Sequence, residues 1–135
     1  MLDRFLVPQN TIVTAKGDSQ SLDIGEAASR VFLLTLSITS IVEQESIEIG
    51  IFTSADATTW DTKPIFSSPQ KFYAGEYPML LDLSSAPSAK FVRAHWEVTR
   101  WGRGPTTPTF EIGLRLREVS KEALHEAQAE AQGRR

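Results

Sequence analysis

The strongest constraint on the fold is an alternation of apolar and polar residues with a period of two. It is clearest between Arg30 and Ile41, where Phe32, Leu34, Leu36 and Ile38 occupy every second position. Successive side chains of a β-strand point to opposite faces, so this pattern predicts a strand with one face in a core. The same alternation recurs later in the chain. The residues that it assigns to the core are Phe32, Leu34, Leu36, Ile38, Ile47, Ile49, Ile51, Leu81, Val92, Trp96, Phe110, Ile112 and Leu114.

Short alternating segments separated by turn residues predict an all-β fold, an antiparallel β-sandwich of jelly-roll-like form over residues 1–119. A chain of 135 residues fits a single domain of this kind. Near the start, Thr11–Ala15 and Gln20–Ile24 flank the turn-like Lys16-Gly17-Asp18, and this arrangement predicts a β-hairpin. The segment Val42–Glu45 is expected to form a solvated turn.

The pattern changes after Val119. Residues 120–135 are rich in helix-forming residues, with Ser120 suited to cap a helix and Gly133 to end it. This predicts a short C-terminal α-helical tail. Its apolar residues are mostly alanines, so we expect the tail to be marginal alone and to pack on a partner.

The composition argues against several classes of function. Without cysteine there is neither a disulfide framework nor a thiolate metal site. The formal net charge of −3 disfavours a nucleic-acid partner, which usually requires a basic face. No apolar run approaches the roughly 20 residues of a membrane span, and the N-terminus does not resemble a signal peptide. We therefore expect synthesis in the cytoplasm and no membrane partner.

Catalytic residues are not apparent. His95 and His125 have no recognisable partner motif, and no nucleophile–base pair can be identified. There is no phosphate loop, metal-spaced histidine pair or dinucleotide fingerprint. A solvated turn is favoured over a calcium site for Glu43, Glu45 and Glu48. The sequence predicts a protein that is not an enzyme and that binds no metal or cofactor.

One candidate site is the turn Ser54–Trp60, with the sequence Ser-Ala-Asp-Ala-Thr-Thr-Trp. Asp56 can accept backbone N–H groups and fix the turn, and Trp60 can then fold back on the edge of the sandwich. Together with the strand before it, the segment resembles the Ser-x-Asp-Gly-x-x-Trp pattern of discoidin-type and other jelly-roll β-sandwiches, including those of phage virion proteins. It also partly resembles the Asp-box turn of sialidases. Ala57 or Thr58 replaces the usual glycine. The alternatives are a structural turn and a sugar-stacking site at Trp60.

A second candidate is the segment Arg100-Trp101-Gly102-Arg103, at the end of a long strand. Tryptophan and arginine are enriched among the residues that contribute most to protein interfaces. The hypothesis is a contact with another protein chain; the alternatives are a solvated turn and a site that stacks a nucleic-acid base.

A third candidate is a mixed-charge sheet face, which is either solvated or a surface that seats a symmetry mate. It assumes that the strands 91–101 and 110–117 are neighbours. Its residues are Arg93, His95, Glu97, Glu111, Arg115 and Arg117.

These features favour a non-catalytic structural protein. The predicted role is a subunit or decoration component of a virion-like or other homo-oligomeric particle, with protein as its partner. The alternative is a small carbohydrate- or ligand-binding module that uses Trp60 and Trp101.

Overall fold

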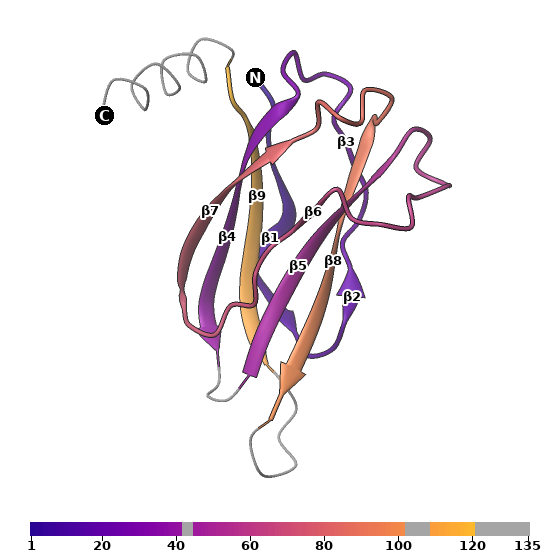
Figure 1. The fold of residues 1–135 in the computed structure, drawn as a ribbon. Helices are drawn as coiled ribbons and strands as arrows, with labels where there is room; N and C mark the ends of the chain where they lie inside the picture. Colours follow the sequence, from indigo (N-terminus) through magenta and orange to yellow (C-terminus); the bar gives the residue numbers. More distant parts are fainter. Residues whose placement is uncertain (42–44, 102–108, 121–135) are drawn as a thin grey trace, which may run out of the picture.

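The computed structural model describes residues 1–41, 45–101 and 109–120, which form two antiparallel β-sheets packed face to face as a β-sandwich (Figure 1). The first sheet has the order β1 (Asp3–Val13), β9 (Phe110–Glu118), β4 (Val31–Ile41) and β7 (Gly75–Asp82). In the second sheet, β2 (Gly17–Asp18) and β3 (Leu22–Asp23) both pair with β8 (Phe91–Arg100), which is followed by β5 (Glu45–Ser54) and β6 (Phe66–Ser67).

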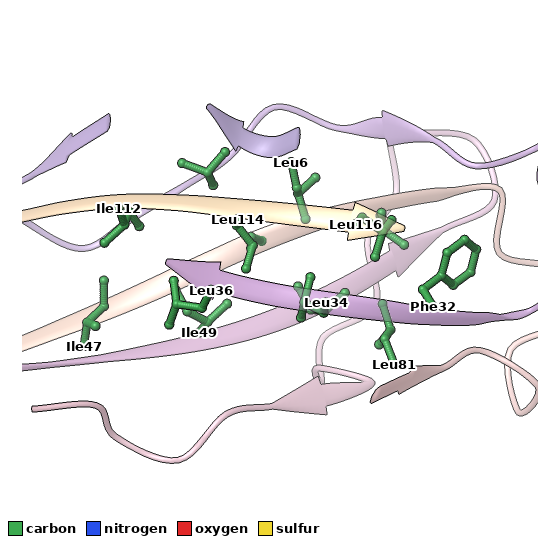
Figure 2. Packing of buried hydrophobic residues seen from close by; sticks show 14 of the residues in the cluster. Leu6, Phe32, Leu34, Leu36, Ile47, Ile49, Leu81, Ile112, Leu114 and Leu116 are labelled. Atoms are coloured by element: carbon green, nitrogen blue, oxygen red, sulfur yellow. The ribbon is translucent and has the colours of Figure 1, made fainter. Parts of the chain in front are cut away.

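The core lies between the two sheets, and most of its members come from alternate positions of β4, β5, β8 and β9. Figure 2 also shows Leu6 of β1 and Leu81 of β7 within it. The core residues predicted from alternation are all buried except Trp96, which is half-buried at the margin of the core. Trp96 lies on the inner face as predicted, but β8 has only the short β2 and β3 beyond it. Its ring therefore reaches the edge of the sandwich.

The predicted N-terminal hairpin is wrong. Thr11 and Val13 belong to β1 and pair with β9 in the first sheet, whereas Leu22 pairs with β8 in the second. The residues between them carry the chain from one sheet to the other. Short β-branched segments around a glycine suit a crossover as well as a hairpin, and the pairing with distant strands decides between them.

The first half of β1 has no counterpart in the sequence prediction. Its register with β9 shifts between Phe5 and Val7 and again between Val7 and Thr11. At the first shift the adjacent residues Leu6 and Val7 are both buried. Such bulges break the period of two, which is the signal that identifies a strand in sequence.

Two further expectations need correction. Glu45 is not part of a solvated turn but is the first residue of β5, and only 1% of its surface is exposed. The strands β8 and β9 lie in different sheets, so the charged residues of 91–101 and 110–117 do not share a face.

The predicted tail lies outside the described residues apart from Ser120. Within the described part of the chain there is no helix that is long and apolar enough to cross a membrane.

Candidate functional site

The turn after β5 is held by Asp56 and Ser54. One carboxylate oxygen of Asp56 accepts the backbone N–H groups of Thr58 and Thr59, each at 2.9 Å. The Ser54 hydroxyl accepts the N–H of Ala57 at 2.9 Å and donates to the carbonyl of Thr59. These hydrogen bonds, of which that from the backbone of Thr59 has the largest effect, lower the pKa of Asp56 to about 2. Its carboxylate is therefore ionised at all but very acid pH.

The backbone at Ala57 adopts a conformation that favours glycine. Its φ angle is +66°, in the left-handed region where a Cβ atom is crowded. Of Ala57 and Thr58, the two residues that could replace the glycine of the Ser-x-Asp-Gly-x-x-Trp pattern, only Ala57 has a positive φ.

Replacing Ala57 with glycine is expected to raise the free energy of unfolding by roughly 0.5–1 kcal/mol. Relief of the crowded Cβ outweighs the greater freedom of glycine in the unfolded chain. Denaturant unfolding measures the change. Ala55→Gly, two residues away at an exposed position without a positive φ, is the control and should lower stability slightly. Equal effects of the two substitutions would contradict the assignment of strain to Ala57.

Trp60 is half-buried, and one face of its ring is already occupied. The guanidinium of Arg93, on the outer face of β8, lies 4.5 Å from the centroid of the indole. This cation–π contact ties the turn to the second sheet. A sugar could stack on Trp60 only on the other face of the ring or after displacing Arg93.

The segment predicted as an interface separates into residues with different positions. Arg100 follows Val98 on the inner face of β8, its side chain is only 13% exposed, and its Nη1 lies 4.0 Å from the carboxylate of Glu45. The Glu45 carboxylate also accepts the backbone N–H of Thr109 at 3.0 Å, which joins the two sheets at this end of the sandwich. Arg100 is therefore turned away from the outer surface, and Arg103 lies outside the described residues.

Trp101 lies on the outer face, with 53% of its surface exposed. Its ring meets that of Phe72 edge to face at a centroid distance of 5.8 Å, and Phe72 lies 6.5 Å from the ring of Tyr73. Phe72 and Tyr73 are 42% and 76% exposed. We call these three residues the aromatic patch.

The sequence pattern does not identify Phe72 and Tyr73 as site residues, although the segment 71–74 is aromatic. No alternation links them to Trp101. They are brought together because Lys71 bridges to Ile47 at the start of β5, where β8 ends. The Tyr77 hydroxyl donates to the carbonyl of Tyr73, and the Lys71 ammonium lies 4.6 Å from the Tyr77 ring, so the segment is held on both sides.

His95 is the titratable group with the most partners on the outer face of β8. Its Nδ1 lies 2.9 Å from a carboxylate oxygen of Asp18, and its Nε2 lies 2.8 Å from one of Glu97. The pKa of His95 is raised above its usual value, mainly by the hydrogen bond to Glu97 and further by the hydrogen bond to and the charge of Asp18. The side chain is 28% exposed and lies on a sheet face. Both ring nitrogens are thus engaged by carboxylates.

Among the described residues, no three histidine, aspartate or glutamate side chains are grouped closely enough to hold a metal ion. Comparison with protein-family models finds no match to this chain, and comparison with curated proteins finds none either.

Proposed function

We propose that this protein is a non-catalytic assembly subunit, a jelly-roll β-sandwich that associates with other protein chains through the aromatic patch. A homo-oligomer or virion-like particle is the assembly that such a subunit would build, and the particle is where the protein would reside. The observation that carries the proposal is the cluster of three exposed rings, Phe72, Tyr73 and Trp101.

The order of the strands supports the jelly-roll assignment. If β2 and β3 are counted as one interrupted strand, the eight strands form two four-stranded sheets, 1-9-4-7 and 2/3-8-5-6. The first strand lies beside the last, and the chain crosses between the sheets at most connections. Two interleaved Greek keys produce this order, which occurs in capsid and lectin domains.

The edges of the first sheet favour association through faces and loops. In the pair of β4 and β7, the N–H of Leu83 donates to the carbonyl of Arg30. Because successive residues of an antiparallel strand direct their hydrogen-bonding groups to alternate sides, the backbone nitrogen of Pro78 points away from β4, toward the open edge of the sheet. Proline offers no N–H there, which discourages the addition of another strand. The opposite edge, β1, is bulged.

The aromatic patch has the properties of an interface core. Aromatic residues, above all tryptophan and tyrosine, make the largest contributions to binding energy because they bury much area with few rotatable bonds. The other large exposed apolar residues of the described chain include Ile12 and Leu80 on the outer strands of the first sheet. Such residues, when single, need no partner.

The double substitution Phe72→Ala with Trp101→Ala is expected to weaken self-association by roughly tenfold or more, because it removes two adjacent interface rings. Light scattering or sedimentation over a range of concentrations measures the association. Leu80→Ala removes a comparably exposed apolar side chain from another face and serves as the control. It should leave the association unchanged.

A wild-type protein that stays monomeric at every concentration would contradict the proposal, as would a double variant that associates like the wild type. Stability should change little in both variants because the replaced side chains are exposed.

The second candidate is a carbohydrate-binding module, and the exposure of the Tyr73 and Trp101 rings favours it, since stacking on an aromatic ring needs a free face. This function is tested by titrating the double variant and the wild type with a panel of oligosaccharides while tryptophan fluorescence is recorded. A response that only the wild type shows, without association, would support the module instead of the subunit.

A further inference from the structure

A groove opens along one edge of the sandwich, where β1 faces the segment that carries β2 and β3. Its volume is about 320 Å³. Phe5 and Pro8 of β1 form one side, Leu22 of β3 forms the other, and Trp96 lies between them. None of the lining residues carries a charge. We call this the edge groove.

The edge groove is preformed because Trp96 is held in place. The indole N–H donates to the carbonyl of Ala15 at 3.0 Å. The ring lies against Gly17, where a Cβ atom would meet it at 3.3 Å. A closed apolar cavity of roughly 150 Å³ can hold a benzene ring. The edge groove is therefore large enough to receive an aromatic side chain.

The edge groove and the Phe72–Tyr73 part of the aromatic patch lie on opposite edges of the sandwich. Trp101 follows the end of β8 and is separated from Trp96 of the groove by five residues of strand, roughly 16 Å. The groove is bounded by β1, β2 and β3, which are the strands at one end of each sheet. Phe72 and Tyr73 belong to the connection between β6 and β7, the strands at the other end of each sheet (Figure 1). The patch of one molecule therefore cannot reach its own groove.

We propose that the aromatic patch of one copy inserts into the edge groove of a second copy, head to tail. This inference rests on the proposed function and adds the partner and the geometry of the contact. The rings and the groove are both uncharged, so their contact requires no ion to be desolvated, which would cost free energy. The exposed rings of the patch and the apolar residues of the groove become covered in a single contact.

Such a contact is heterologous, since it joins two different surfaces. A pair keeps one free groove, on the copy whose patch is bound, and one free patch, on the other copy, so association continues until a ring closes or a filament forms. An isologous contact, patch against patch, would instead stop at a dimer.

Complementation between two variants distinguishes these arrangements. The groove variant is Ser21→Arg, which places a long charged side chain at an exposed position lining the groove. The patch variant is Phe72→Ala with Trp101→Ala. Each variant alone is expected to associate roughly tenfold to a hundredfold more weakly than the wild type.

An equal mixture is expected to form a heterodimer, twice the 15.0 kDa mass of the chain, and to grow no further. The intact patch of the groove variant fits the intact groove of the patch variant, and no second contact remains. Sedimentation velocity of each variant and of the mixture measures this result.

Ser85→Arg makes the same change in an exposed loop outside the groove and should associate like the wild type. Gln20→Arg is a second groove variant in case Ser21→Arg alters the fold, which circular dichroism would reveal.

A groove variant that associates like the wild type would overturn this inference and leave the proposed function intact. Two weakened variants that fail to combine in the mixture would also overturn it. A wild-type protein without any self-association would contradict the proposed function itself.

Discussion

Replacement of Phe32 by alanine is expected to lower the free energy of unfolding by about 3–5 kcal/mol, the range for loss of a large buried aromatic side chain. Phe32 lies on β4 with none of its surface exposed, and its strand stands between β7 and β9 in the first sheet. Its removal leaves a cavity that the strands on both sides cannot fill by moving closer. The midpoint of urea unfolding, with an unchanged slope, measures the loss.

Trp96→Ala is the matched comparison, because the sequence assigns both residues to the core. The structure places the Trp96 ring partly in the edge groove, where solvent already reaches it. We therefore expect its replacement to cost less than that of Phe32, although tryptophan is the larger residue. Equal losses at the two positions would contradict the position of Trp96 at the edge.

Replacement of Glu118 by glutamine is expected to cost roughly 2–4 kcal/mol, because hydrogen bonds to a buried charged acceptor contribute more than neutral ones. Only 4% of the surface of Glu118 is exposed. Its carboxylate accepts the backbone N–H groups of Leu2 at 2.9 Å, Ala28 at 3.0 Å and Ser29 at 2.9 Å. A glutamine amide retains one acceptor oxygen and turns an NH₂ group toward the remaining donors.

The same carboxylate makes stability depend on pH. The hydrogen bonds, that from Leu2 first, lower the pKa of Glu118 below its ordinary value of 4.5. A group with a lowered pKa in the folded state contributes its full stability above its unfolded pKa and loses it as the pH falls through the folded value. The difference between wild type and Glu118→Gln should therefore be complete above about pH 4.5 and shrink at lower pH.

Glu111→Gln is the control for both measurements. Glu111 also lies on β9 but at a more exposed position, and its side chain accepts no backbone N–H shown in the structure. Its replacement should change stability little and leave the pH dependence unaltered. A Glu118→Gln protein as stable as the wild type at pH 7 would show that the three N–H groups find other acceptors.

Only some parts of the candidate site are visible in the sequence. Asp56 and the residues that follow it are neighbours along the chain, so their hydrogen bonds are a matter of local turn chemistry. The exposed position of Trp101 follows from counting along β8. The same count places Arg100 on the inner face, which conflicts with its assignment to a protein interface.

The remaining members of the site could not be found in this way. Phe72 meets Trp101 only because Lys71 pairs with β5. The edge groove requires β1 and β3, which belong to different sheets, to lie side by side at the margin of the sandwich. Nothing in either segment marks the other as its neighbour.

The amino-acid sequence by itself determined that the protein is built from strands and which faces of β4, β5, β8 and β9 enter a core. That information is local, because the direction of a side chain from a strand depends only on whether its position is odd or even. The tertiary structure alone decided that β1 pairs with β9, that β8 and β9 part into different sheets, and that Glu118 joins three distant N–H groups. Those arrangements depend on contacts between residues far apart in the chain. No short stretch of sequence reveals a bulge, a crossover between sheets or the partners of a single buried charge.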